Sequence, residues 1–443
     1  MSDHSTVQAP ALAGFTREAV EALSARMGEP GWALEQRLAA FAAFEALPMP
    51  TVHDEGWRKT DLSGLRLGSL RPFAEPDGRA ALPAQVSAWL EAAGARAGFL
   101  LQRDSLTVQR DLDGALRRKG VIFTDLDAAV REHAGLLREH LHTCVRPDEM
   151  KLHALHAAFR SGGTFLYVPR GVEVEVPLLS HAWIDTEGAA VFPHTLVLAE
   201  SGSKVTLIDA YRSAEGQAQT LAVPVVELIL RDGSTVRYVN HQDWSRHVWQ
   251  VGVIRALLER DTTVNSLVIA FGAQLMRLGV EALLRGSGAT SEMLGVFFGD
   301  RRQHYDFQTL QEHVATSTTS NLLYKGALTD QARSVFSGMI RAHYGAQKTN
   351  AFQINRNLIL SEQAKADSMP KLEIMANDLR CTHGASVSRL DEEHIFYLRS
   401  RGLTRVQAVR MIVEGFFSDV LDRIPLPYIR EALEREIAAK MRV

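Results

Sequence analysis

The chain has 443 residues, of which 46% are hydrophobic and 23% charged, and its net charge is -3. This length is too great for one ordinary core, so it predicts either two or three domains or one elongated repeat architecture. The near-neutral charge gives no electrostatic reason to expect nucleic-acid binding. No apolar run reaches the roughly 18 to 20 residues of a membrane helix, and residues 1–6 lack a basic-then-apolar signal sequence. We therefore expect a cytoplasmic protein.

Two cysteines, Cys144 and Cys381, are too few for a disulfide framework in a chain of this length. In a reducing compartment each is either a small buried residue or a reactive or ligating thiol. The two must therefore be considered separately.

The first third of the chain is helical in pattern. Apolar residues recur three and four apart in residues 15–23, 32–41 and 126–159, and Pro48 ends the second run. Gly162 and Gly163 follow the last run and indicate a boundary near residue 160. We expect an N-terminal helical region over residues 1–160.

From residue 161 to about residue 390 a repeat replaces the helical period. Small or turn-prone residues follow short apolar runs, and alternating runs come after them, at intervals of about 26 to 31 residues until a last, longer step of 39. The markers are Gly171, Gly202, Gly233, Asp261, Gly288, Ser317, Gly345 and Gly384.

Strand, tight corner and strand at a fixed period is the signature of a solenoid in which each coil buries its face against the next. A β-propeller needs longer repeats, and a β-sandwich or double jelly roll would not keep this period over eight units. A parallel β-helix over residues 161–390 is the favoured fold. The long last step predicts that about ten additional residues, from Asn377 to His383 among them, interrupt the final coil.

The chain returns to helical spacing after Leu390. Thr404 and Gln407 form a capping box, and the helix that follows carries a wide apolar stripe from Val406 to Ile424. Pro425 and Pro427 end this helix and introduce a last one. We expect a C-terminal helical domain over residues 391–443, with an apolar face available for docking.

No standard catalytic or nucleotide-binding motif is present in the sequence. It contains no G-x-x-x-x-G-K-[ST] loop, G-x-S-x-G elbow or H-E-x-x-H helix. We expect a non-catalytic protein, with any ATP-driven step carried out by a partner.

Histidines and one cysteine are concentrated between residues 140 and 156. His140, His142 and Cys144 are followed by His153 and His156, and imidazole and thiolate are suited to zinc or iron. Because the spacing is loose, a histidine-rich helix surface is the simpler interpretation.

The second candidate is Cys381-Thr382-His383. Residues two apart in a strand point to the same face, so the thiol and the imidazole would project together. A nearby imidazolium would lower the pKa of the thiol and favour the thiolate that binds iron, copper or persulfide sulfur. A packed cysteine beside a surface histidine is the structural alternative.

The chain resembles the SufB/SufD family of iron–sulfur cluster assembly scaffolds. The resemblance rests on LRCTHGA at residues 379–385 and FYLRSRGL at residues 396–403, and extends to EGWRKT at 55–60 and FLYVPRGV at 165–172. It covers nearly the whole chain, and the C-terminal motif is specific. Of the two paralogue types the chain looks like the D type, because the B type carries Glu-His-Glu-Ala where this sequence has Cys381-Thr382-His383-Gly384.

The resemblance implies a right-handed parallel β-helix between helical segments. It also implies pairing with the SufB paralogue through the β-helix edge and docking of the SufC ATPase through the C-terminal helices. His383 and Cys381 would lie near the SufB interface and contribute to a transiently held iron or iron–sulfur cluster, without a stable cofactor in the isolated chain. The expected docking residues are Tyr397, Arg399, Arg401, Gly402, Val409, Ile412 and Phe416.

The leading hypothesis is thus a scaffold for iron acquisition and cluster formation, with transfer of the cluster to apoproteins. Two alternatives stay open at this point. One is a β-helix carbohydrate-active enzyme, which needs paired carboxylates, whereas Glu227 and Glu281 form no evident pair. The other is a homodimeric metal-binding protein that uses the cluster from His140 to His156.

Overall fold

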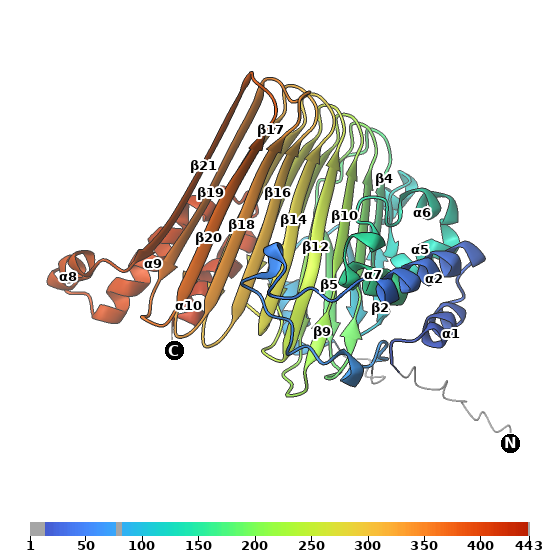
Figure 1. Ribbon diagram of the computed structural model, residues 1–443, viewed down its shortest axis with the longest axis horizontal. Coiled ribbons are helices and arrows are strands. Elements are labelled where there is room, and N and C mark those ends of the chain that lie inside the picture. Colours follow the sequence, from blue (N-terminus) through green and yellow to red (C-terminus); the bar gives the residue numbers. More distant parts are fainter. Residues whose placement is uncertain (1–13, 77–81, 442–443) are drawn as a thin grey trace.

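The computed structural model describes residues 14–76 and 82–441 and is mainly β, with helices near both chain ends (Figure 1). Residues 1–6, on which the expectation of no signal sequence rests, lie outside the described residues. Among the residues that are described, no helix is both long and apolar enough to cross a membrane.

The central region is a solenoid of about eight turns, as predicted. Its strands alternate between two large sheets, and neighbouring strands within each sheet of the solenoid pair in parallel. The 10-stranded sheet has the order β2 (Leu106–Leu112), β1 (Gly98–Arg103), β5 (Leu178–Ile184), β8 (Lys204–Ser213), β11 (Thr235–Asp243), β13 (Thr263–Ala270), β15 (Thr290–Gly299), β17 (Thr319–Leu328), β19 (Thr349–Ile359) and β21 (Leu379–Arg389).

The second sheet has 11 strands and lies opposite the first. Its order is β20 (Lys365–Ile374), β18 (Arg333–Ala342), β16 (His304–His313), β14 (Leu275–Leu284), β12 (Val248–Leu258), β10 (Val225–Leu230), β7 (His194–Ala199), β4 (Gly163–Val168) and β3 (Ile122–Asp125), with β6 (Ala190–Val191) and β9 (Thr220–Ala222) beside β12.

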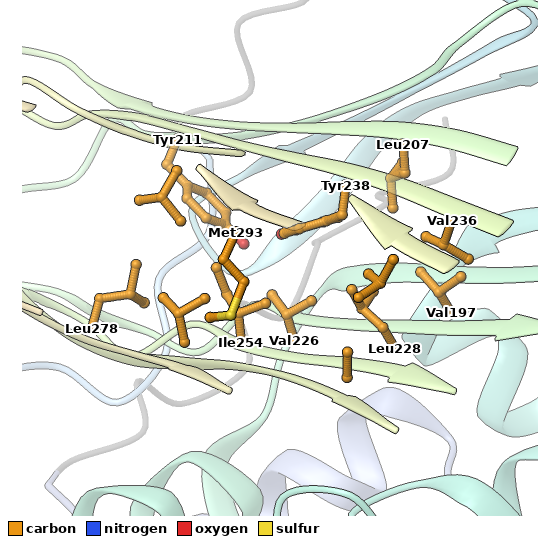
Figure 2. Close-up of a cluster of buried hydrophobic side chains, with 14 of the residues drawn as sticks. Val197, Leu207, Tyr211, Val226, Leu228, Val236, Tyr238, Ile254, Leu278 and Met293 are labelled. Carbon is orange, nitrogen blue, oxygen red and sulfur yellow. The ribbon is translucent and has the colours of Figure 1, made fainter. Parts of the chain in front are cut away.

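The inner faces of the two sheets form the main core. Alternate residues of each strand point inward, and stacking of the coils aligns them in rows such as Leu207 beside Tyr238. Figure 2 shows aliphatic and aromatic side chains from both sheets meeting there, including Val226, Leu228 and Met293. Burying each such side chain contributes about 1.5–3 kcal/mol, so the stacked coils stabilise one another.

The corners explain the repeat markers seen in the sequence. The first six markers, from Gly171 to Ser317, all have positive φ, between 55° and 76°. Glycine adopts this left-handed conformation freely and aspartate tolerates it better than most residues, so these residue types recur where the chain turns from one sheet to the other.

The expected interruption of the last coil is wrong. The eighth corner lies at residues 375–378, between β20 and β21, and Gly384 lies inside β21, which pairs continuously with β19 from Leu379 to Arg389. No residue of that corner has positive φ, so it lacks the sequence signature of the earlier corners. The last coil is therefore an ordinary coil.

Helices cover the N-terminal end of the solenoid. They are α1 (Arg17–Met27), α2 (Gly31–Ala46), α3 (Ala84–Ala93), α4 (Gly114–Arg118), α5 (Leu126–Glu132), α6 (Ala134–His140) and α7 (Lys151–Phe159), with short 3-10 turns at Glu55–Trp57, Leu67–Ser69 and Pro147–Glu149. The sequence pattern did not predict β1, β2 and β3 in this region. β2 and β3 pair antiparallel to β1 and β4 and so close this end of both sheets.

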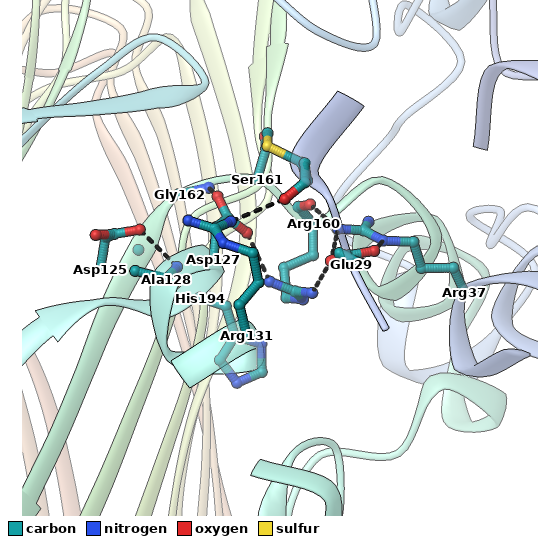
Figure 3. Close-up of polar contacts among 12 residues, drawn as sticks. Glu29, Arg37, Asp125, Asp127, Ala128, Arg131, Arg160, Ser161, Gly162 and His194 are labelled. Atoms are coloured by element: carbon teal, nitrogen blue, oxygen red, sulfur yellow. Dashed lines mark hydrogen bonds and ion pairs between the residues drawn. The ribbon is translucent and has the colours of Figure 1, made fainter. Parts of the chain in front are cut away.

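A buried ion-pair network fastens these helices to the first coil (Figure 3). Glu29 binds Arg37 of α2 at 2.6 Å and Arg160 at 2.7 Å, and Arg160 also binds Asp127 of α5 at 2.9 Å. Asp127 in turn accepts from the backbone N–H of Gly162, which leads into β4. The network thus links α2, α5 and the residues that directly follow α1 and α7 to the point where the solenoid begins.

The EGWRKT segment lies on the outer face of the 11-stranded sheet and reaches its last strands. The Thr60 hydroxyl donates to Asp306 of β16 at 2.5 Å, and the Arg277 guanidinium lies 3.8 Å from the centre of the Trp57 ring. Glu55 pairs with Lys371 of β20 at 3.1 Å. The N-terminal region therefore contacts both the first and the last coils.

The C-terminal helices are α8 (Glu392–Ser400), α9 (Arg405–Leu421) and α10 (Pro427–Lys440). The predicted capping box at Thr404 and Gln407 is confirmed. Val413 and Phe417 of α9 pack with Leu323 and Leu358 against the outer face of the 10-stranded sheet, which accounts for most of the apolar stripe. In contrast, α8 projects beyond the last strands (Figure 1).

Replacing Glu29 with glutamine is expected to lower the free energy of unfolding by about 3–5 kcal/mol, because Arg37 and Arg160 would be left buried without their shared anion. Burial alone would raise the pKa of Glu29, but attraction by the two arginines outweighs it and lowers the pKa to about 2. The stabilisation is thus complete above the usual pKa of 4.5 and is lost as the pH falls towards 2.

Urea unfolding at pH 7 and at pH 3 measures this effect. The difference between wild type and Glu29→Gln should shrink at pH 3, whereas Glu21→Gln, which breaks an exposed pair with Arg17, should change stability little at either pH. Equal stability of Glu29→Gln and wild type at pH 7 would contradict the assigned role of the network.

Candidate functional site

The two ends of the solenoid differ. Antiparallel strands and helices close the N-terminal end, whereas β20 and β21 are the outermost strands of their sheets at the other end. Leu372, Ile374 and Val387 are 41%, 39% and 49% exposed, yet their register partners Ile340, Ala342 and Asn357 are buried on the inner face. These apolar side chains continue the core and are exposed because no further coil covers them.

Cys381 and His383 lie on β21 at this open end. They pair in register with Ala351 and Gln353, both buried on the inner face of β19. Since register partners in parallel strands share a face, both side chains belong to the inner face of the last coil. Cys381 is half-buried and His383 is exposed. The expected projection of the two side chains from one face is thus present.

The expected activation of the Cys381 thiol is not found. Burial raises the pKa of Cys381 above its usual value of 9.0, and no other influence on the thiol is resolved. Burial raises the pKa of Cys144 still further, and the neighbouring Glu227 carboxylate adds to this effect. At neutral pH both side chains are therefore thiols until a metal ion or another cation approaches.

The interior holds polar side chains near the open end, as it also does around Asp209 in the earlier coils, and the sequence pattern did not predict them. Asn355 accepts from Asn357 at 2.7 Å and from Ser368 at 2.8 Å, and Gln353 donates to the Gly338 carbonyl at 3.2 Å. The Oε1 atom of Gln353 and the Oδ1 atom of Asn357 are buried without a hydrogen-bond partner. The sequence signal that could have predicted these polar groups is the alternation of Gln353, Asn355 and Asn357 at inward positions of one strand.

Farther inside, His313 bonds to Ser320 at 2.8 Å and to Thr318 at 2.7 Å, and burial lowers the pKa of His313 to about 4. Polar side chains therefore extend over the inner faces of the last coils up to Cys381 and His383. An unpaired buried carbonyl oxygen costs about 1–3 kcal/mol, so this part of the interior is less stable than an apolar core would be. Such sites are typical of function rather than of packing.

The histidines between 140 and 156 are only partly brought together. His142 and His156 lie close to His194 of β7, with ring centres 5.0 and 5.2 Å from it. His140 instead bonds to Arg231 at 3.1 Å, and His153 faces Glu149. Sequence spacing could not identify His194 as a neighbour, because it comes from a strand nearly forty residues later in the chain.

The carboxylates considered for glycan cleavage are already engaged. Glu227 accepts backbone N–H groups from His142, Cys144 and Val145, and Glu281 binds Arg255 at 2.6 Å. Desolvation raises the pKa of Glu227 to about 7. The geometry gives no open pair of carboxylates at these two positions.

The predicted docking residues fall into two groups. Tyr397, Arg399, Arg401 and Gly402 are exposed in and after α8, whereas Val409, Ile412 and Phe416 are half-buried in α9. Val409 and Phe416 pack against the helix–sheet cluster, so they are less available than expected.

Large apolar side chains on α8 and α9 are nevertheless exposed. Phe396 is 73% exposed, Tyr397 57%, Val406 68% and Met411 50%. The apolar surface that remains free lies on α8 and the first part of α9. We call these four residues the α8–α9 patch.

Comparison with known families assigns the chain. Residues 182–416 match the model described as "SUF system FeS cluster assembly, SufBD core domain", and residues 103–179 match "SufBD protein N-terminal region". The chain belongs to the SufBD family. The expected family and its function class, a scaffold in iron–sulfur cluster assembly by the SUF system, are thereby confirmed.

Individual members of the SufBD family align with this chain over most of its length. The iron–sulfur cluster assembly protein SufD of Bacillus subtilis is 31% identical, covering 96% of this chain and 98% of the relative. The SufB protein of the same organism is 29% identical, covering 94% and 91%. A SufBD family protein of Staphylococcus saprophyticus is 28% identical. Because SufB and SufD are almost equally similar, the paralogue type must be argued from particular residues.

Alkylation of the folded protein should distinguish the two cysteines by their reactivity. Iodoacetamide is expected to modify half-buried Cys381 and to leave buried Cys144 unmodified, with a rate that keeps rising above pH 9 because the raised pKa keeps the thiolate scarce at pH 7. Mass spectrometry of the intact protein and its peptides measures this. A modification rate that is already maximal at pH 7 would show that a cation activates the Cys381 thiol.

Proposed function

We propose that the chain is the D-type scaffold subunit of a SufB–SufC–SufD complex and supports iron acquisition and cluster formation for transfer to apoproteins. The observation that carries the proposal is the placement of Cys381 and His383 together on the inner face of the terminal strand. The run Cys381-Thr382-His383-Gly384 supports the D type, since the B type carries Glu-His-Glu-Ala at this place.

The open end supports a partner of the same architecture. Free edges of β20 and β21 present unpaired backbone groups, and Leu372, Ile374 and Val387 present apolar side chains beside them. A homologous solenoid that extends both sheets would satisfy the backbone and cover these side chains together. The SufB paralogue fits this requirement, and a second copy of this chain would fit it in the absence of SufB.

The ligand count supports a shared site. An iron–sulfur cluster as a whole is generally held by four protein ligands, whereas Cys381 and His383 supply one thiolate and one imidazole. The remaining ligands would come from the partner across the open end. The cluster is cargo in this scheme, and the thiol of Cys381 loses its proton when iron binds.

The α8–α9 patch supports docking of an ATPase subunit. Its four exposed apolar side chains lie on two neighbouring helices, and the Arg401 guanidinium lies 5.2 Å from the centre of the Tyr397 ring. The sequence has no phosphate-binding loop of its own, so we assign ATP hydrolysis to the SufC partner bound there.

Replacing His383 with alanine in the purified complex is expected to lower cluster yield and iron content at least several-fold while SufC ATPase activity stays at the wild-type level. His394→Ala is the matched control, because His394 is an exposed histidine on α8 outside the open end. Cluster yield is measured by visible absorption and iron content by elemental analysis. Wild-type values for His383→Ala would refute its role.

The double substitution Tyr397→Ala and Val406→Asp is expected to weaken binding of the ATPase subunit at least ten-fold, because it removes an aromatic side chain and places a charge in the apolar patch. Tyr344→Ala is the control, since Tyr344 is 78% exposed at a solenoid corner. Isothermal titration with purified SufC measures the affinity. Unchanged affinity of the double variant would exclude the α8–α9 patch as the docking surface.

A further inference from the structure

A chain of hydrogen-bonded side chains lies between the N-terminal helices and the outer face of the 11-stranded sheet, away from the open end. The ring of His156 contacts the Val223 carbonyl oxygen through Nδ1 at 2.7 Å and His194 Nδ1 through Nε2 at 3.0 Å. His194 Nε2 in turn lies 3.0 Å from Oε2 of Glu227. His156, His194 and Glu227 are fully buried.

The direction of these bonds is determined from one end. A carbonyl oxygen only accepts, so Nδ1 of His156 carries hydrogen and donates to Val223. In the neutral ring Nε2 of His156 is then an acceptor, and Nδ1 of His194 donates to it. The remaining nitrogen of neutral His194, Nε2, therefore directs a lone pair towards Oε2 of Glu227.

Glu227 is also arranged as an acceptor. Its Oε1 accepts backbone N–H groups of Cys144 and Val145, both at 2.7 Å, and its Oε2 accepts that of His142 at 2.9 Å. Two lone pairs, one on nitrogen and one on oxygen, therefore face each other across 3.0 Å. This arrangement requires a cation shared by the two atoms, either a proton between them or a metal ion bound by both.

His142 completes a set of three ligands. One ligand atom each of His142, His194 and Glu227 lies within 4.8 Å of the other two. His142 is partly exposed as a residue, and its ring packs against the ring of His194, with 5.0 Å between the ring centres. It has a φ of 61°, a left-handed conformation that is uncommon for histidine and places the ring beside His194.

The groups around these ligands also fit a metal site. Metal-bound histidines usually donate their second ring N–H to another group, as Nδ1 of His194 does to His156, and bound carboxylates are held by further hydrogen bonds, as Glu227 is by three amides. The two nearby arginines already have carboxylate partners. Arg160 pairs with Glu29 and Asp127, and Arg255 pairs with Glu149 and Glu281.

We propose that His142, His194 and Glu227 bind one divalent transition-metal ion, Zn²⁺ or Fe²⁺, with His156 as the positioning residue for His194. Two imidazoles and one carboxylate suit both ions and leave a coordination position open for water or a small ligand. The ion would join the loop after α6 to strands β7 and β10. This site is separate from Cys381 and His383 and does not depend on the role proposed for them.

The experiment uses the full chain with Cys381→Ser and His383→Ala, so that the open end cannot contribute ligands. The protein is stripped with EDTA, desalted, and titrated with Co²⁺ as a spectroscopic probe and with Zn²⁺, or with Fe²⁺ under anaerobic conditions. We expect one tightly bound ion per chain, a Co²⁺ absorption spectrum of a nitrogen–oxygen site, and a rise in melting temperature on adding Zn²⁺.

His142→Asn is the decisive variant, because asparagine tolerates positive φ and the substitution removes one of the three proposed ligands. It is expected to weaken metal affinity at least ten-fold. His140→Asn, two residues earlier and directed towards Arg231, is the matched control and should bind as the parent does. Equal affinity of His142→Asn and the parent, or less than one bound ion in the parent, would refute the site and leave a proton between His194 and Glu227.

X-ray absorption of the metal-loaded parent protein gives a test that needs no further substitution. A spectrum with two imidazoles and only nitrogen and oxygen ligands supports the proposal. Because this spectrum is measured on the parent protein, the test remains valid if His142→Asn fails to fold. A sulfur ligand would overturn the proposal, because Cys144 would then hold the ion instead.

Discussion

Stacking of parallel coils requires that each coil be covered on both sides, and a solenoid of finite length meets this requirement at neither of its ends without a cap. In this protein the first coil is covered within the chain, by β2, β3 and the N-terminal helices. The last coil is not, and Leu372, Ile374 and Val387 remain partly exposed. This asymmetry determines where a partner can bind and where a shared site can form.

Electrostatic interactions reinforce the same asymmetry. At the closed end, buried Glu29 and Asp127 neutralise Arg37 and Arg160, and each charge has a partner at close range. At the open end, the polar groups of Gln353 and Asn357 are incompletely satisfied. Buried side-chain atoms without a hydrogen-bond partner also occur near the closed end, as at Ser161 and His181, so the open end differs in where they lie. There they lie beside Cys381 and His383, where the interior meets a surface that a partner would cover.

The repeat architecture could be predicted because corners have strong sequence requirements. Residues such as Gly202, Gly233 and Asp261 adopt positive φ, which only a few residue types tolerate, so the residue types themselves indicate the turn positions. The last corner has no left-handed residue, and Gly384 inside β21 was mistaken for it. The strands β1 and β3 were missed for a different reason, since each pairs with a strand that comes about forty or more residues later in the chain, and β2 is paired only with β1.

The candidate sites were predictable only where their residues are close in sequence. Cys381 and His383 share a face because they are two apart in one strand, and this needs no tertiary information. The partners of His142 could not be found in the same way, because His194 and Glu227 come from two separate coils and meet the loop only after the solenoid has formed. A solenoid brings residues one coil apart into neighbouring rows, so a histidine on one strand and a carboxylate on the next can form a site on the outer face. The same stacking that leaves one inner face open thus also brings together, near the closed end, the three side chains that we propose as metal ligands.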